Sequence, residues 1–211
     1  MTVIAKTFED LSRVGGRPSL DFVNTEGGHR NGPPEWLESY GDIVGWGASV
    51  GLLDAEEATD LLMEASAKPE EANRVFERTI ELREGLFRVL RSVREGRESA
   101  GGDLAVLDRE LSTALARLKL TPGGDRFEWR FIGGERALDR VLWPIVRDAA
   151  DLLSSDALER IEECDGDNCT WLFVDTSRNH SRRWCKMGDC GNRAKARRYY
   201  QKHKQSTRGT P

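Results

Sequence analysis

Residues 164–204 have the sequence CDGDNCTWLFVDTSRNHSRRWCKMGDCGNRAKARRYYQKHK and contain all four cysteines of the chain. The cysteines form two close pairs, Cys164/Cys169 and Cys185/Cys190, with fifteen residues between the pairs. A structural zinc takes two thiolates from each of two turns to complete a tetrahedron, so this arrangement predicts one zinc ion bound by four cysteines. Two disulfides or unpaired thiols are the alternatives. A disulfide framework is typical of small secreted chains without a core, whereas this chain has 211 residues.

The residues around the cysteines predict the shape of this module. Residues 170–176 are rich in aromatic and β-branched side chains and predict a strand that leaves the first cysteine pair. Residues 177–181 predict a turn, after which residues 182–184 lead back to the second pair and complete a hairpin. From Cys190 to Lys204, helix formers without β-branched residues predict a helix. This order is that of a treble clef, and four thiolates leave no position for water, so the predicted zinc is structural.

Charge is divided unevenly along the chain. From Arg178 to Arg208 there are seven arginines and four lysines against one acid, Asp189, a formal charge of +10. The whole chain carries −4, so residues 1–177 carry about −14. A basic segment on an acidic body is typical of a nucleic-acid-binding module. A solvated basic tail is the alternative.

The order of the positive residues favours a DNA-binding face. On the predicted helix they follow two neighbouring ridges, and the arginines of the predicted hairpin can reach an adjacent phosphate. Asn192 and Arg193 begin the helix and have the chemistry to contact base edges, although Asn192 can equally cap the helix or brace the zinc loop. The predicted DNA contacts are Arg178, Arg182, Arg183, Asn192, Arg193, Lys195, Arg197, Arg198 and Lys202.

Apolar residues recur every three or four positions over most of the N-terminal part and predict helices. The overall fold class expected is α+β, mostly α: a helical N-terminal domain with a small β-hairpin, followed by a C-terminal treble-clef-like zinc finger. The predicted elements are helices over residues 35–51, 55–67 with Asp54 as cap, 69–94, 103–118 and 136–154 with a kink at Pro144, and a hairpin over residues 118–132.

Residues 18–25, PSLDFVNT, lie in a region punctuated by glycine and proline. Their partial alternation predicts a short strand or a buried extended segment.

Several of these motifs resemble a known bacterial family. Residues 175–179 (DTSRN), residues 182–185 (RRWC) and above all residues 190–195 (CGNRAK) resemble the CGNR zinc finger, and LDFVNT resembles the opening motif of the ABATE domain that precedes it. Members are regarded as stress-related transcription regulators with a ligand-sensing N-terminal half and a DNA-binding finger. One departure is the acidic first knuckle, residues 165–168, where the family pattern implies less charge and where a phosphate contact is not expected.

The resemblance also implies a ligand pocket near the opening motif. The residues it assigns to that pocket are Asp21, Asn24, Thr25 and Arg30. A local network of caps and turns is an equal alternative, because Asp, Asn and Thr side chains readily bond nearby backbone groups.

The division expected is an ABATE-like domain over residues 1–157, a CGNR zinc finger over residues 158–205 and a disordered tail over residues 206–211. No apolar run approaches the roughly 20 residues of a membrane span. The first residues also lack the apolar core of a secretory signal. We therefore expect a cytoplasmic location, where thiols stay reduced and available to metal.

The expected function is a ligand-responsive, DNA-binding transcription regulator with one structural zinc. Its partners would be DNA and a small molecule, with no membrane, and a homodimer would let two fingers contact paired half-sites. No catalytic motif is present, and we expect no enzymatic activity. The alternative is a small-molecule-binding protein or enzyme whose finger is only a structural or protein-interaction module, and RNA is a further candidate partner of the same finger.

Overall fold

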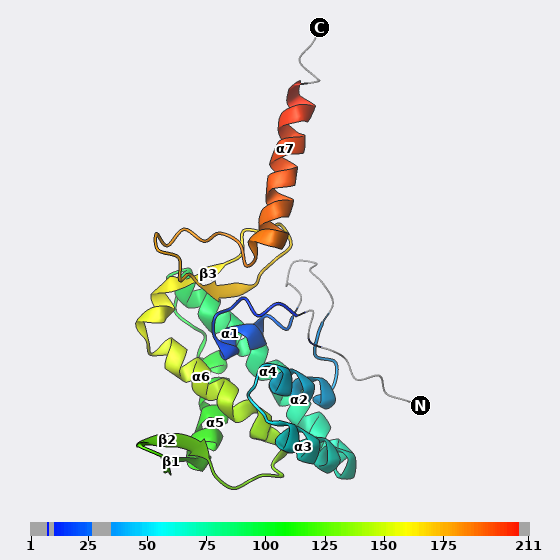
Figure 1. Cartoon of the computed structure of the whole chain (residues 1–211), viewed down its shortest axis with the longest axis vertical. Coiled ribbons are helices and arrows are strands. Elements are labelled where there is room, and N and C mark those ends of the chain that lie inside the picture. The colour runs from blue at the N-terminus through cyan, green and yellow to red at the C-terminus, as the bar shows by residue number, and fades with distance from the viewer. Residues whose placement is uncertain (1–7, 9–10, 27–34, 207–211) are drawn as a thin grey trace.

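The computed structural model describes residues 8, 11–26 and 35–206, with side chains as far as residue 203. They form a helical body from whose end the last helix, α7, projects (Figure 1). The elements in chain order are α1 (Pro18–Val23), α2 (Tyr40–Ser49), α3 (Ala55–Ala67), α4 (Pro69–Arg94), α5 (Gly101–Arg117), β1 (Leu118–Gly123), β2 (Arg126–Phe131), η1 (Leu138–Leu142), α6 (Trp143–Leu153), η2 (Asp156–Arg160), β3 (Ile161–Glu163), β4 (Leu172–Val174), η3 (Met187–Gly191) and α7 (Asn192–Ser206). The expected class, mostly helical with small hairpins and a cysteine-clustered C-terminal module, is confirmed.

Helix α4 is the central element of the body and contacts α1, α2, α3, α5, η1 and β3. Its apolar face carries Leu82, Leu86 and Leu90, none of which has exposed surface. Pro69 starts the helix, where a proline lacks only an N–H that would have no helical partner. Burial of apolar side chains such as these lowers the free energy when the other helices pack around α4.

Helices α2 and α3 begin next to side chains that cap them. The cap predicted at Asp54 is present as half of a capping box: the Asp54 side chain accepts from the Glu57 N–H, and the Glu57 side chain accepts from the Asp54 N–H. Helix α2 begins at Tyr40 and not at residue 35, so the predicted start was wrong. Ser39 caps α2 by accepting from the Asp42 N–H at 3.2 Å.

Two other local predictions were wrong. Residues 18–23 form the helix α1 and not a strand, since Pro18 is pre-organised for a first helical turn and three of the apolar side chains are buried together. Pro144 does not kink a long helix. It stands at the start of α6, and the residues before it form the separate 3-10 helix η1.

The predicted hairpin of β1 and β2 is present, and its register pairs Leu118 with Phe131 and Leu120 with Trp129. At its base, Phe131 packs against Trp143 with ring centroids 5.6 Å apart. The hairpin lies at the end of the body opposite α7 (Figure 1).

The hairpin predicted within the finger has a different partner strand. Strand β4 pairs antiparallel with β3, which precedes the first cysteine pair, and residues 182–184 form no strand. The first cysteine pair therefore occupies the connection between β3 and β4. Ile161, Leu172 and Val174 belong to the main hydrophobic core, so these two strands join the finger to the helical body.

Among the described residues, no helix is both long enough and apolar enough to span a membrane. Residues 207–211, the end of the predicted tail, lie outside the described part of the chain, and Ser206 belongs to α7.

Candidate zinc centre and nucleic-acid interface

The four cysteines meet at one point. Cys164 and Cys169 come from the β3–β4 connection, Cys190 lies in η3 immediately before α7, and Cys185 lies just before η3. All four are buried, none is in a disulfide, and their sulfur atoms lie within 4.8 Å of one another. The predicted alternative of two disulfides is therefore not the arrangement that the chain adopts.

Donors from the surrounding chain point at the sulfur atoms. The backbone N–H groups of Gly166 and Cys185 donate to Cys164 Sγ at 3.4 and 3.2 Å, and Arg193 Nη2 donates to Cys190 Sγ at 3.1 Å. A side chain at Gly166 would place its Cβ 3.0 Å from Cys190 Sγ, so glycine leaves room there for the cysteine cluster. Such donors orient metal ligands and stabilise thiolate charge.

Because the four thiols lie close together, repulsion opposes the ionisation of more than one of them unless a cation is present. The Cys164 thiol accepts hydrogen bonds from those of Cys169 and Cys185, which lowers the pKa of Cys164 to about 2. The same contact with Cys164 raises the pKa of Cys169 to about 12, and it also raises the pKa of Cys185. A dication removes this conflict, because it holds several thiolates together.

Four buried sulfurs without an open position fit one structural zinc ion. When bound, zinc supplies folding energy to this module and no chemistry of its own. The chain positions α7 through this centre, since Cys190 lies only two residues before the start of the helix at Asn192.

Arg182, which was predicted to contact a phosphate, is half-buried in the finger, and its guanidinium bonds to backbone carbonyls of the chain. The guanidinium lies 4.0 Å from the centre of the Phe173 ring and donates to the carbonyl oxygens of Val14, Trp184 and Cys185 at 3.0, 3.1 and 2.6 Å. The Arg182 N–H also donates to the Asp175 carboxylate at 2.9 Å. These contacts fold the loop that replaces the predicted hairpin.

Three other predicted DNA contacts are paired with acids of the finger itself. Arg183 pairs with Asp165 at 2.6 Å, Arg193 with Asp189 at 3.4 Å, and Arg197 with Asp167. These acids include both charges of the knuckle that departs from the family pattern.

Two more of the predicted DNA contacts are Asn192 and Arg178. The side-chain amide of Asn192 donates to the Gly188 carbonyl at 3.2 Å, which is the bracing role weighed from the sequence. Arg178 is exposed in the loop that follows β4, and in the sequence this loop is well separated from the start of α7.

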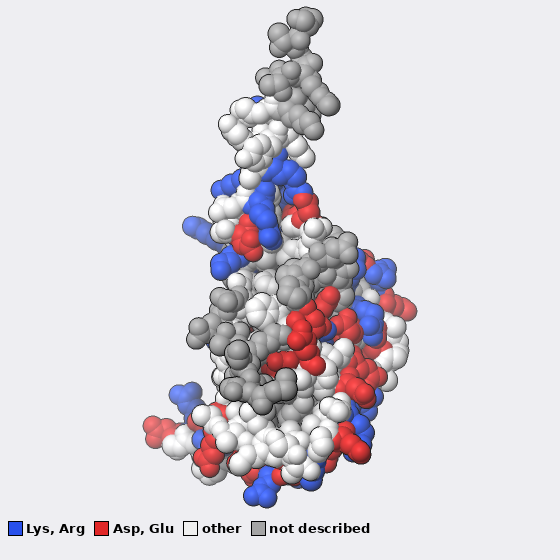
Figure 2. Space-filling view, turned by 90° about the vertical axis from the view of Figure 1, so that its right-hand side faces the viewer, with Lys and Arg blue, Asp and Glu red and all other residues white. Residues whose placement is uncertain are grey.

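The remaining cations form a separate face of α7. Lys195, Arg198 and Lys202 are spaced by three and four residues and therefore share one side of the helix. All three are exposed, and within the described residues none forms an ion pair. Arg197 and Arg193, by contrast, project on another side toward the acids. Lys and Arg gather around the base of α7 with acids among them (Figure 2).

Comparison with family models identifies both parts of the chain. The ABATE model, described as "Putative stress-induced transcription regulator", matches residues 16–156, and the CGNR zinc finger model matches residues 160–203. The chain belongs to the ABATE family. No curated protein gives a match to it.

The CGNR finger is bound to the start of the ABATE domain by a set of hydrogen bonds. The buried side chain of Asn24 donates to the Leu172 carbonyl at 2.9 Å and accepts from the Leu172 N–H at 2.8 Å. The Val174 N–H donates to the Gly15 carbonyl at 2.9 Å, and Trp171 Nε1 donates to the Glu26 carbonyl at 3.1 Å. Strand β4 is thereby held between β3 and the segment around α1.

The predicted ligand residues have partners inside the chain. Asp21 accepts from the Gly15 N–H at 2.8 Å, and burial raises the pKa of its carboxyl group. Thr25 donates to the Phe22 carbonyl at 2.7 Å and accepts from Arg83 at 3.3 Å. These contacts, and those of Asn24, are of the cap-and-turn kind weighed as the alternative. Arg30 lies outside the described residues, and the ligand role of the set stays a prediction.

One side of the CGNR finger is acidic. A hollow of about 550 Å³ lies beside the loop that carries His180, with η2 and β3 as its other walls. His180 has a positive φ of 45°, a backbone conformation that few side chains adopt. Its carboxylate-bearing lining residues are Asp156, Glu159, Glu162 and Asp175. Arg160 also lines the hollow, but the carboxylates outnumber it, so the basic face of α7 is the better candidate for a duplex.

Two contacts of the finger were not predicted from the sequence: Asn24 as a clamp on β4, and Asp167 as a partner of Arg197. The only available signal for Asp167 was the unusual acidity of the first knuckle. For Asn24 there was none, because its partner Leu172 is 148 residues away.

Proposed function

We propose that this chain is a DNA-binding transcription regulator in which the zinc-held finger presents α7 to a duplex and the ABATE domain senses a small molecule. The proposal assigns no catalytic step to the chain. The observation that carries it is the exposed face of Lys195, Arg198 and Lys202, on a helix that projects from the body and is anchored by the cysteine cluster.

The dimensions and charge of α7 suit the major groove. A helix with its side chains is about 10–12 Å across, and the groove is about 12 Å wide. The fifteen residues of α7 extend about 22 Å at 1.5 Å per residue. Each phosphate neutralised by a lysine or arginine releases condensed counterions, so the predicted binding weakens steeply as salt rises.

Ligand sensing is supported by the way the finger is attached. Gly15, Asn24 and Glu26 lie just before or within the first part of the ABATE match, and each bonds to a residue of β4 or to Trp171 immediately before it. A ligand that favours one position of α1 would therefore favour one position of β4. If the ligand binds one of these positions more tightly than the other, it also changes the affinity of the finger for DNA.

Selection of bound duplexes from a random DNA pool by the zinc-loaded protein tests the proposal. The control is Lys195→Gln combined with Arg198→Gln, two exposed changes that leave the cysteines and the core in place. Enrichment of a motif that the double variant fails to enrich supports a sequence-specific regulator. No enrichment by either protein contradicts it.

A second candidate is a small-molecule-binding protein or enzyme whose finger is a structural clip. It is favoured by the internal pairing of Arg182, Arg183, Arg193 and Arg197, which leaves fewer free cations than the sequence implied. On this account DNA affinity would match that of any basic protein of equal charge, and the double variant would bind all duplexes alike.

A further inference from the structure

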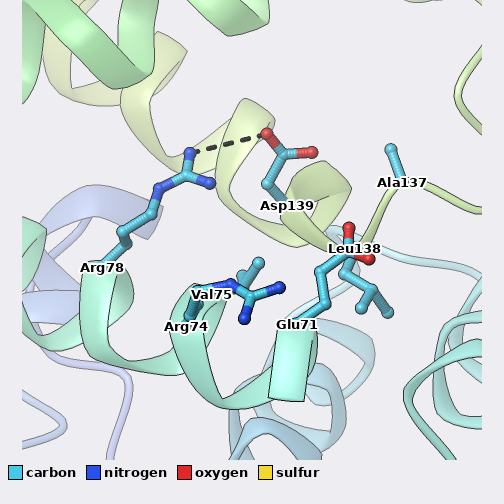
Figure 3. A pocket seen from close by; sticks show the side chains of 7 residues that line it. All are labelled: Glu71, Arg74, Val75, Arg78, Ala137, Leu138 and Asp139. Carbon is cyan, nitrogen blue, oxygen red and sulfur yellow. Dashed lines mark ion pairs between the residues drawn. The ribbon is translucent and has the colours of Figure 1, made fainter. Parts of the chain in front are cut away.

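A surface hollow of about 370 Å³ lies between the first half of α4 and η1 (Figure 3). Helix α4 contributes Glu71, Arg74, Val75 and Arg78, and residues 137–139 form the opposite wall. The volume falls at the lower end of the range of pockets that bind small molecules. It suits a small ligand.

The lining combines two cations and two carboxylates. One pair is already made, since Arg78 lies 3.5 Å from Asp139 and 2.5 Å from the buried Glu110. These contacts fix one edge of the hollow. The Tyr40 hydroxyl, which donates to the Leu138 carbonyl at 2.8 Å, fixes the η1 wall from beneath.

The other two charges form no close ion pair with any described residue, although Glu71 adds at longer range to the effect of Glu64 in raising the pKa of Lys68. Glu71 and Arg74 stand three residues apart on α4, yet neither forms an ion pair within the part of the chain that the structure describes. The Glu71 carboxylate is directed toward the η1 wall (Figure 3). Val75 and Leu138 also line the hollow, and since only 4% and 1% of their surface is exposed, they form a small apolar floor between the charged groups.

The hollow thus offers a guanidinium and a carboxylate that form no ion pair with any of the described residues. A ligand of single sign would meet a like charge: phosphate or a dicarboxylate would meet Glu71 and Asp139, and a polyamine would meet Arg74 and Arg78. A ligand that carries both signs would satisfy both sets, because guanidinium binds carboxylate through two parallel hydrogen bonds.

We propose that this hollow binds a small zwitterion with the chemistry of a free α-amino acid. Arg74 receives the carboxylate, Glu71 and Asp139 receive the ammonium group, and the apolar floor contacts the ligand side chain. This site is separate from the residues of the LDFVNT motif that the family resemblance assigned to a ligand.

The hollow lies on the same helix that contacts the finger. At the other end of α4, Arg94 pairs with Glu162 at 3.2 Å and Arg91 lies 3.7 Å from Glu163, both acids belonging to β3. From Arg74 to Arg94 the helix extends about 30 Å at 1.5 Å per residue. As a sensory site the hollow rests on the proposed function, whereas binding of the zwitterion does not.

The test is calorimetric titration of the zinc-loaded full chain with glycine, L-leucine and L-phenylalanine. L-Leucinamide lacks the carboxylate, and 4-methylpentanoate lacks the ammonium group, so both serve as matched probes for leucine. We expect saturable binding of at least one amino acid. For leucine, each matched probe should bind at least about tenfold more weakly, the scale expected when one charged interaction is removed.

Two substitutions locate the site. Arg74→Gln and Glu71→Gln should each weaken amino-acid binding at least about tenfold. Arg126→Gln, an exposed change of equal charge on the distant hairpin, should leave it unchanged. The inference is overturned if none of the three amino acids binds saturably below about 20 mM, or if the amide binds as well as the acid. An unchanged affinity in Arg74→Gln would also overturn it.

DNA binding of the same preparation, measured without amino acid, reports on the finger alone. If no amino acid binds while DNA binding is intact, only this inference is refuted. Intact amino-acid binding without DNA binding would refute only the proposed regulator.

Discussion

Neutralising Asp167 should strengthen DNA binding, although the change removes an ion pair from the folded protein. Asp167 pairs with Arg197, and the two side chains are 59% and 41% exposed. A phosphate that contacts Arg197 must displace this carboxylate and then lies close to it. Asp167→Asn removes both the competition and the repulsion.

The size of the effect follows from the exposure of the pair. Exposed ion pairs contribute about 0.2–1 kcal/mol, so removing the competitor should tighten duplex binding by about 1.5- to 5-fold. If Arg197 then gains a full phosphate contact, the slope of log affinity against log salt should steepen by up to about 0.9.

Fluorescence anisotropy of a labelled duplex at several salt concentrations measures both quantities. Asp125→Asn is the matched control, because it makes the same charge change at the exposed hairpin turn at the far end of the body. Combining Asp167→Asn with Arg197→Gln should abolish the gain. Equal or weaker binding by Asp167→Asn, or a gain equal to that of Asp125→Asn, would refute the reasoning.

Three further changes test the zinc centre and the attachment of the finger. Cys190→Ser should lose the bound zinc, measured as metal content, and should lower the unfolding temperature of the whole chain because Leu172 of the finger lies in the main core; full metal content would contradict the four-cysteine site. Asn24→Ala leaves two buried backbone groups unpaired and should cost about 2–4 kcal/mol in denaturant unfolding. The exposed Asn179→Ala should change stability by less than about 0.5 kcal/mol, and equal effects of the two changes would dismiss the clamp. Arg182→Lys should destabilise the finger by about 1–2 kcal/mol while the slope of log DNA affinity against log salt stays constant. A shallower slope would show that Arg182 contacts DNA phosphate.

Several predictions that rest on neighbouring residues agreed with the structure, although those for the start of α2, for residues 18–23 and for Pro144 did not. The cap at Asp54, the start of α4 at Pro69 and the hairpin around Gly124 each depend on side chains or turns within a few positions. The cysteine cluster was also predictable, because thiols in two close pairs have few roles in a chain of this size.

Predictions that needed a partner distant in sequence were incomplete. The sequence indicates that residues 172–174 are extended. Residues 161–163 and residues 182–184 could each pair with them as a strand. Burial of Ile161 in the main core favours the pairing with residues 161–163, which form β3. The charge of α7 was evident, but its division into paired and unpaired faces depends on where the knuckle acids lie in space. The same limit hid the contact between Asn24 and Leu172.

The most direct test of the DNA-binding claim is the salt dependence of duplex binding by the zinc-loaded chain and by a variant with Gln at positions 195, 198 and 202. These three side chains are exposed, and their only ring contact among the described residues, that of Arg198 with Trp184 at 5.8 Å, is worth about 0.5–1 kcal/mol at an exposed site, so the variant should keep its zinc and lose little stability. If the face of α7 binds phosphate, the slope should become shallower by about 0.9 for each phosphate that is no longer neutralised, up to about 2.7 for all three. An unchanged slope in a folded, zinc-loaded variant would show that this face does not bind DNA and would contradict the proposed function.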